Sequence, residues 1–387
     1  MIRSKKSLRS AAALVGVAAL ALTAACGSSD SGSKSDGGSS AGKLCGKNIA
    51  FLGALTGDAG ALGQNMLGGV KLAVDEYNKA NADCKVGVKD FDSQGSPDKA
   101  PALATQIVND DSIFGLVGPG FSGESLATGK TFFEAGLPSI SPSATNVTIT
   151  HQGWTTWHRV IGNDEAQGNA DAKYLTETAG AKKVFVIDDG QDYSKGLAGT
   201  VKSALGSAAI GSDQISVGQT DMSAVVTKVK TSGADAVFYG GYYTEAGLLV
   251  KQLRQGGFKG TFMSGDGAED PAFVKAAGGS AAEGAVLSAP AAPAPADFNA
   301  KYKAANGGKD SGLYSTQAYD ATNIFLAALK DGASDAKAIN EFIHTYSATG
   351  ASGPIAFDKD GDITQSTIYA YFVKGGKLDV SNPTPIK

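Results

Sequence analysis

The segment best suited to chemistry is Gly118-Pro119-Gly120-Phe121-Ser122-Gly123, which has the spacing G-x-G-x-x-G. It follows an apolar run typical of a strand and precedes a helical pattern, the context in which a glycine-rich turn holds a phosphate. A dinucleotide site also needs an acidic residue about 20 positions further on, where this chain has Pro138-Ser139-Ile140-Ser141-Pro142. Backbone N–H groups at such a helix start can still hold an anion. We therefore expect this turn to bind a carboxylate rather than a pyrophosphate.

Other signatures of enzymes and metal sites are incomplete. Gly120-Phe121-Ser122-Gly123-Glu124 lacks the final glycine of the nucleophile elbow G-x-S-x-G. The three histidines, His151, His158 and His344, do not have the spacing of a metal motif. The turn Asp358–Asp362 starts like an EF-hand loop, but no Glu follows at the twelfth position. We expect a solvated turn there, and no catalytic residue, metal ion or cofactor.

The elements that must position these residues alternate between strands and helices. This alternation predicts an α/β fold with two doubly wound parallel-sheet lobes and a cleft between them. The proline-containing stretch Ala289–Ala296 interrupts the pattern and is typical of a crossing between lobes. The predicted strands are 48–53, 85–91, 114–117, 137–140, 183–187, 214–217, 236–240, 261–263, 285–288, 355–357 and 368–373. The predicted helices are 63–80, 97–109, 123–135, 166–179, 194–205, 222–231, 243–256, 297–305, 315–330 and 335–347.

The N-terminus has the pattern of an export signal. Residues 1–10 are basic, and Ala11–Ala25 is an unbroken run of small and apolar residues that is too short to span a membrane. We predict a signal peptide at 1–25. Leu22 to Cys26 resembles a bacterial lipobox, and because of this resemblance we expect Cys26 to carry a lipid anchor. Thr23 departs from the motif, which usually has Leu at that position. Residues 26–42 form a Gly/Ser-rich tether; the alternative is an ordinary secreted protein with an incidental Cys.

The two remaining cysteines, Cys45 and Cys84, form an even pair in a chain expected to be exported. Export places them in an oxidising compartment, where such a pair favours a disulfide. Two buried free thiols are the alternative, and a zinc site is disfavoured because no His or third Cys stands nearby.

The charge balance argues against a nucleic-acid partner. The 387 residues include 34 Lys and Arg against 38 Asp and Glu, for a formal net charge of −4. Residues 1–25 hold four of the basic side chains and no acid, so the rest of the chain is more acidic than the total suggests. No basic stripe is available to hold a phosphate backbone.

Five blocks in order resemble the substrate-binding proteins of branched-chain amino-acid ABC transporters, over about residues 46–375. They are Val117 to Gly123, Ile140 to Asn146, Phe238 to Tyr242, Phe262 to Gly267, and Gly353 to Asp362. The resemblance implies a type I periplasmic-binding-protein fold with three hinge crossings. It places the first lobe at 43–161 plus 290–352 and the second at 162–289 plus 353–387.

The resemblance also implies a ligand-binding set. Ser122 and Thr145 would hold the ligand carboxylate, with the Thr145 hydroxyl also accepting from the ammonium. The Ser143 carbonyl would accept from the ammonium as well, and Asp266, where the family commonly has Glu, would be its counter-ion. Tyr193 and Tyr242 match aromatics that close over the ligand. The structural alternatives are turn formers for Ser143 and Asp266 and a core aromatic for Tyr242.

Departures from the family bear on specificity. Leu62 falls where relatives often have an aromatic, Phe121 replaces a smaller residue, and Tyr314 lies near another pocket aromatic. The implied pocket is apolar, so leucine, isoleucine and valine are all candidate ligands. The implied partner is an ABC permease at the outer face of the cytoplasmic membrane. An amide, urea or small aromatic acid as ligand, and a ligand-sensing surface receptor, remain alternatives; an amidohydrolase is disfavoured by the lack of a nucleophile with an adjacent base.

Overall fold

The computed structural model describes residues 43–387, so the predicted signal peptide (1–25), the lipidation site Cys26 and the tether (26–42) lie outside the described residues. Within 43–387, no helix is both long and apolar enough to cross a bilayer. The predicted disulfide between Cys45 and Cys84 is confirmed, with the two Cα atoms 4.7 Å apart.

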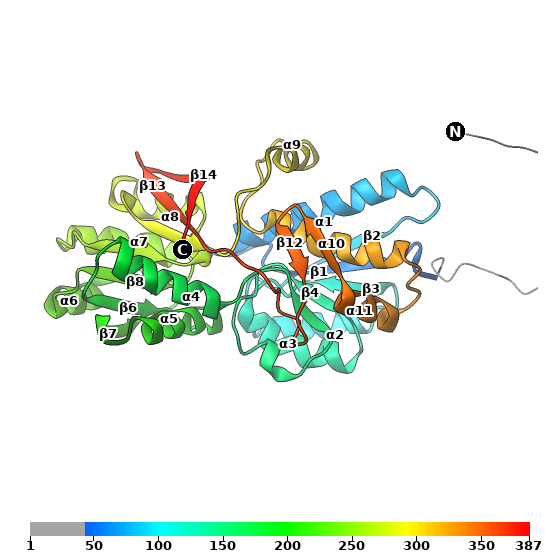
Figure 1. Cartoon of the computed structure of the whole chain (residues 1–387), viewed down its shortest axis with the longest axis horizontal. Helices are drawn as coiled ribbons and strands as arrows, with labels where there is room; N and C mark the ends of the chain where they lie inside the picture. Colours follow the sequence, from blue (N-terminus) through cyan, green and yellow to red (C-terminus); the bar gives the residue numbers. More distant parts are fainter. Residues whose placement is uncertain (1–42) are drawn as a thin grey trace, which may run out of the picture. The chain divides into compact units, whose positions relative to one another are not determined.

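The first lobe is built on a sheet of five parallel strands in the order β2-β1-β3-β4-β5. Helices cover both faces, so β1 and β3 are almost wholly buried and read as continuous apolar runs. The helices α1 and α10 pack on one face, and α2 and α3 on the other (Figure 1). The elements are β1 (Asn48–Gly53), α1 (Gly60–Ala80), β2 (Gly87–Asp92), α2 (Ala100–Val108), β3 (Ile113–Val117), α3 (Ser122–Glu134), β4 (Ser139–Ser141), β5 (Trp157–Arg159), α9 (Ala296–Ala305), α10 (Ser315–Lys330) and α11 (Ala336–Thr345).

The second lobe is built on a seven-stranded sheet in the order β14-β13-β10-β9-β8-β6-β7. Strands β6 to β10 are parallel, whereas β13 and β14 add an antiparallel edge. The helices α4 and α5 pack on one face, and α6, α7 and α8 on the other. The elements are α4 (Asp164–Lys173), β6 (Val184–Asp188), α5 (Asp192–Leu205), β7 (Ala209–Gln214), α6 (Ser223–Ser232), β8 (Ala236–Gly240), α7 (Tyr243–Gln255), β9 (Thr261–Ser264), α8 (Pro271–Ala277), β10 (Val286–Ala289), β13 (Tyr369–Lys374) and β14 (Lys377–Pro385).

The third passage of the chain between the lobes lies later than we expected. The strand β12 (Gly353–Ala356) pairs antiparallel with β11 (Ser347–Gly350), and the backbone N–H of Arg159 donates to the Gly361 carbonyl. Residues 353–361, which we expected in the second lobe, therefore pair with elements of the first, and the chain joins the second sheet only at β13.

The predicted α/β fold with two parallel-dominated sheets is confirmed, but some elements were wrong or missed. The predicted strand 214–217 is wrong, because the edge strand is β7 at Ala209–Gln214. A strand paired on one side only is half exposed, so its sequence carries little apolar signal. The short elements β5 and α8 and the terminal strand β14 were not predicted.

Candidate functional site

The turn between β3 and α3 forms one wall of a cavity between the lobes. Gly118 has a φ of +124°, and a Cβ at this position would lie 2.6 Å from the Leu52 carbonyl oxygen, so only glycine fits. Phe121 is the extended N-cap residue, and α3 begins at the buried Ser122. The positive end of the helix dipole and its free N–H groups thus lie at the cavity wall, an arrangement that favours an anion.

The loop after β4 is fastened to this turn. The Ser143 hydroxyl donates to the Gly120 carbonyl over 2.6 Å, and the Asn146 N–H donates to the Ser122 hydroxyl over 3.2 Å. Both loops follow the carboxyl ends of parallel strands in one sheet, which is where open α/β sheets place ligands.

The opposite wall comes from the second lobe and carries one buried acid, Asp266. The Tyr193 hydroxyl donates to Asp266 Oδ1 over 2.8 Å, and the Tyr314 hydroxyl donates to Oδ2. Burial raises the pKa of Asp266, and the hydrogen bonds from Tyr314, Tyr193 and Gln167 oppose that rise. Since Tyr314 belongs to the first lobe, its hydrogen bond joins the two lobes through the acid.

Tyr314 makes this contact from a strained backbone. Its φ is 68° and its ψ is 0°, in the left-handed region, at the N-cap of α10. This conformation costs a residue with a Cβ about 1–2 kcal/mol. Strain of this kind persists where the surrounding structure holds it and is found at ligand sites.

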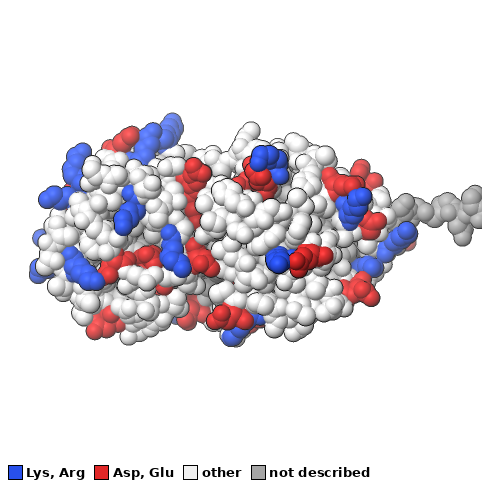
Figure 2. All heavy atoms as spheres, turned by 90° about the horizontal axis from the view of Figure 1, so that it is seen from below, with Lys and Arg blue, Asp and Glu red and all other residues white. Residues whose placement is uncertain are grey.

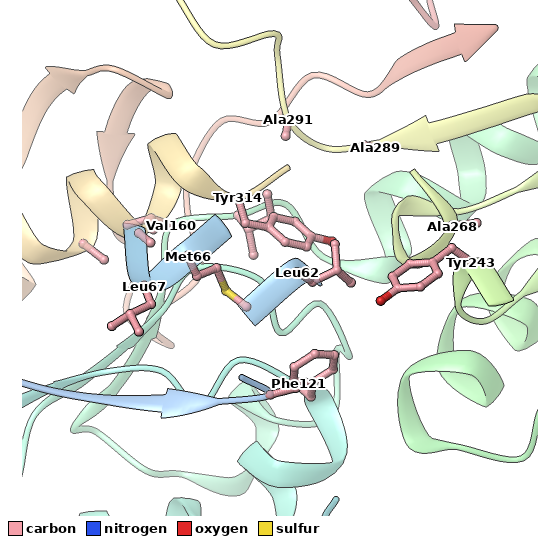
Figure 3. Packing of buried hydrophobic residues seen from close by; sticks show 14 of the residues in the cluster. Leu62, Met66, Leu67, Phe121, Val160, Tyr243, Ala268, Ala289, Ala291 and Tyr314 are labelled. Atoms are coloured by element: carbon pink, nitrogen blue, oxygen red, sulfur yellow. The ribbon is translucent and has the colours of Figure 1, made fainter. Parts of the chain in front are cut away.

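The remaining walls are apolar. In Figure 3, Leu62 and Met66 of α1 converge with Phe121 and Tyr314, which come from two other segments of the first lobe. Across from them, the Tyr242 ring lies 5.6 Å from the Phe121 ring and 5.2 Å from the Tyr193 ring, measured between centroids.

The cavity unites eight of the nine residues predicted for the ligand site. Its free volume is about 10 Å³, room for about one water, so a larger ligand could enter only if the lobes part. Thr145 is buried but does not line it. Met66, Gly120 and Gly267 line the cavity but were not predicted. The sequence held one indication for Met66, because it lies one helical turn after Leu62. The predicted residues lining the cavity are Leu62, Phe121, Ser122, Ser143, Tyr193, Tyr242, Asp266 and Tyr314.

The charge around the cavity has one sign. Among residues 43–387, Asp266 is the only charged residue in its lining, and the two adjoining hollows add Asp58, Asp192 and Glu245 but no Lys, Arg or His. Figure 2 shows acidic side chains gathered along the middle of one face of the molecule. An anionic group in the cavity would therefore be held by N–H and hydroxyl groups alone. Within residues 43–387, no cluster of side chains suits a metal ion.

The comparison with known sequences identifies this architecture. Residues 47–377 match the family described as periplasmic binding protein. The chain belongs to the periplasmic binding protein family. This family is extracytoplasmic and consists of substrate-binding proteins.

Several relatives of this periplasmic binding protein share most of its length. The leucine-specific-binding protein of Salmonella typhimurium is 33% identical over 329 residues, which cover 81% of this chain and 87% of that protein. A Leu/Ile/Val-binding protein of Rhizobium johnstonii is 30% identical over 340 residues, covering 85% and 92%. The solved structure of the substrate-binding protein LivJ from Streptococcus pneumoniae, in complex with isoleucine, matches with a TM-score of 0.81 at 28% identity, covering 88% of this chain and 99% of that chain.

Behind the cavity of this periplasmic binding protein, Thr145 faces a second buried acid, Asp164. The Thr145 hydroxyl lies close enough to lower the pKa of Asp164, although neither side chain makes a hydrogen bond of good geometry within residues 43–387. Burial, with Asp266 nearby, raises the pKa of Asp164 to about 7. Sequence reasoning missed Asp164, since its position at the start of α4 favours an ordinary helix-terminal acid.

A third buried acid lies beside the helix start. Glu124, in the first turn of α3, is fully buried and accepts from the Ser93 hydroxyl. Burial raises its pKa to about 8, against the hydrogen bonds from Ser93 and the backbone at Phe121 and Gly120. Near neutral pH this carboxyl therefore holds a proton and adds no negative charge next to Ser122.

We expect this proton to make ligand binding pH-dependent. As the pH rises through about 8, Glu124 ionises, and its charge should weaken binding of a carboxylate ligand several-fold. The same carboxyl should lower the free energy of unfolding between about pH 4.5 and pH 8, because the unfolded chain gives up the proton first. Calorimetric titration with leucine from about pH 7 to about pH 9 should show the affinity loss in the wild type and a smaller loss in Glu124→Gln, in which Asp164 can still ionise. The exposed Glu134→Gln is the control, and an unchanged slope in Glu124→Gln would assign the titration to another group.

Arg159 anchors the Thr145 loop and was also missed. Its fully buried guanidinium donates to the carbonyls of Ala144 and Asn146, each over 3.0 Å, and pairs with Asp362. We expected only a solvated turn at 358–362, and for Asp362 this was wrong. The partners are 203 residues apart, so no local spacing could reveal the pair.

Proposed function

We propose that this protein captures a zwitterionic aliphatic amino acid, leucine, isoleucine or valine, in the cavity between its lobes and delivers it to an ABC importer. The observation that carries the proposal is the pairing of opposite walls. One wall offers the amide and hydroxyl groups of a helix start and, among residues 43–387, no positive side chain, and the other offers the buried acid Asp266. A small molecule that bears both a carboxylate and an ammonium fits both walls at once.

On the first lobe, the carboxylate would lie at the start of α3. The N–H and hydroxyl groups of Ser122 point to this role, since an N-terminal helix turn stabilises an anion without a counter-charge. We assign the Thr145 N–H to the same carboxylate and its hydroxyl and the Ser143 carbonyl to the ammonium. Thr145 and Ser143 lie in the loop that is fastened to this turn.

On the second lobe, the ammonium would be met by Asp266. A buried ammonium is costly unless it is paired and hydrogen-bonded. Asp266 already accepts from Tyr193 and Tyr314, so the ligand would add a charge-assisted bond to an acid that both lobes hold in place. Closure around the ligand would then be driven by contacts that exist only when the lobes meet.

The aliphatic side chain would pack against Leu62, Met66, Phe121 and Tyr242, which line the cavity. Apolar walls separate ligands that differ by one methylene by about 1–3 kcal/mol. We therefore propose a graded preference among leucine, isoleucine and valine rather than strict selection. Relatives that carry leucine and isoleucine in their names support this range.

We further propose that the protein works at the outer face of the cytoplasmic membrane, anchored through lipidated Cys26, without catalysis and without a cofactor. The lipobox-like sequence and the Gly/Ser-rich stretch behind it support the anchor. Membership of a family of extracytoplasmic binding proteins supports export and a permease partner.

The proposal is tested by removing one ligand charge at a time. Calorimetry should show saturable binding of leucine, and weaker binding by about 10- to 100-fold for 4-methylpentanoate, which lacks the ammonium, and for leucine amide, which lacks the carboxylate. The loss for 4-methylpentanoate is limited because Asp266 keeps its two tyrosine partners. Equal binding of 4-methylpentanoate and leucine would overturn the amino-acid assignment, and recovery of each ligand unchanged checks that no reaction occurs.

A further inference from the structure

A second cavity lies between the lobes on the other side of Tyr314. Its volume is about 790 Å³, within the range of small-molecule sites. The first lobe contributes Asn65, Leu313 and Tyr314, and the second contributes Glu269 and Tyr371, so the cavity exists only where the lobes meet.

Glu269 is the unusual residue of this cavity. Its side chain is 4% exposed and belongs to the lining, yet within residues 43–387 its carboxyl makes no hydrogen bond or ion pair. The charged groups that act on it are Asp270 and Asp266, both of the same sign. A buried acid normally finds a partner, because leaving it unpaired costs free energy.

The other acids of the lining are already engaged. Asp270 caps α8 by accepting from the Ala272 N–H over 2.7 Å, and the exposed Asp310 pairs with Lys303 over 2.9 Å. In the part of the chain that the structure describes, no Lys, Arg or His lines this cavity. Apolar surface from Leu313, Tyr371 and Val380 makes up much of the remaining wall.

We propose that this cavity is a second ligand site, which takes a small organic cation of the alkylammonium type with its charge against Glu269 and its carbon chain against the apolar wall. The site is distinct from the amino-acid cavity, since Tyr314 is the only one of the described residues that lines both. A cation there would touch both lobes.

The binding should be linked to a proton. Burial, Asp270 and Asp266 raise the pKa of Glu269 well above its ordinary value, as expected for an acid with no cation beside it. The other titratable groups of the lining are Asp310, Tyr314 and Tyr371. An ammonium would lower the pKa of Glu269 again, so its binding should release a proton and tighten as the pH rises above the ordinary range of a glutamate carboxyl.

The test is a calorimetric titration with n-butylammonium chloride in phosphate buffer, with and without leucine. We expect saturable binding to the wild type, at least about tenfold weaker binding to Glu269→Gln, and none of 1-butanol or butyrate. Leucine affinity of Glu269→Gln should stay within about threefold of the wild type, which separates this site from the amino-acid site. Equal butylammonium binding in Glu269→Gln, or no saturable binding to the wild type, would overturn the proposal.

A substitution at the surface provides a second test, which does not depend on whether Glu269→Gln folds. Val380 lies at the cavity rim and is 43% exposed, so Val380→Lys should fold normally and place a positive charge beside the cation. We expect weaker butylammonium binding in Val380→Lys than in the neutral control Val380→Gln, with the same leucine affinity in both. Indistinguishable butylammonium binding in this pair would contradict a cation in this cavity.

Discussion

Replacing Asp266 by Asn is expected to weaken leucine binding by about 100-fold or more, since an ammonium buried without a counter-charge loses about 3 kcal/mol or more. Asn also has one acceptor oxygen, whereas Asp266 accepts from both Tyr193 and Tyr314. In the variant one of the two tyrosines would have to accept from the Asn amide N–H instead of donating to a carboxylate, so one charge-assisted hydrogen bond would be replaced by a weaker neutral one and the charge would be lost. Calorimetry measures the affinity, and circular dichroism checks that the variant folds.

The matched control is Asp192→Asn. Asp192 lies at the cleft mouth in the same lobe, and its side chain is 41% exposed and only loosely paired with Lys195 at 3.7 Å. The same change in net charge should alter leucine affinity little there, because exposed pairs contribute about 0–1 kcal/mol. An Asp266→Asn protein that binds leucine as tightly as Asp192→Asn would show that the ammonium is met elsewhere.

Replacing Asp362 by Ala is expected to lower the free energy of unfolding by about 3 kcal/mol, because it leaves the Arg159 guanidinium buried without its counter-charge. Asp362 is 18% exposed at its side chain and Arg159 is fully buried, so we take the lower end of the range for a broken buried pair. Leucine affinity should fall as well, since Arg159 holds the carbonyls of Ala144 and Asn146 on the loop that carries Thr145. Urea denaturation measures the first effect and calorimetry the second.

Asp360→Ala provides the control within the same turn. The Asp360 side chain is 42% exposed and pairs only with the more exposed Lys359, so we expect a change within about 0.5 kcal/mol. If Asp362→Ala and Asp360→Ala proved equally stable, the ion pair with Arg159 would not be what anchors the Thr145 loop.

Local pattern was sufficient for two elements that are buried along most of their length. The strand 236–240 and the helix 315–330 were predicted with the bounds that β8 and α10 have. β8 is a continuous apolar run, which is typical of a short strand buried on both faces, and α10 carries its apolar residues at helical spacing. The edge strand β7 and the seven-residue helix α8 lack this signal, and β14 pairs only with β13.

The sequence by itself determined the alternating architecture, the cysteine pair, the helix that follows the glycine-rich turn and, through the resemblance, which residues gather around the cavity. Only the tertiary structure decided that Tyr314 reaches across the lobes to Asp266, that Arg159 pairs with Asp362 and that Glu269 is buried without a partner among residues 43–387. The physical reason is the distance along the sequence over which each effect acts. Periodicity and turn chemistry act over a few residues, whereas the burial and pairing of a charge depend on side chains brought together from 48 to 203 positions away.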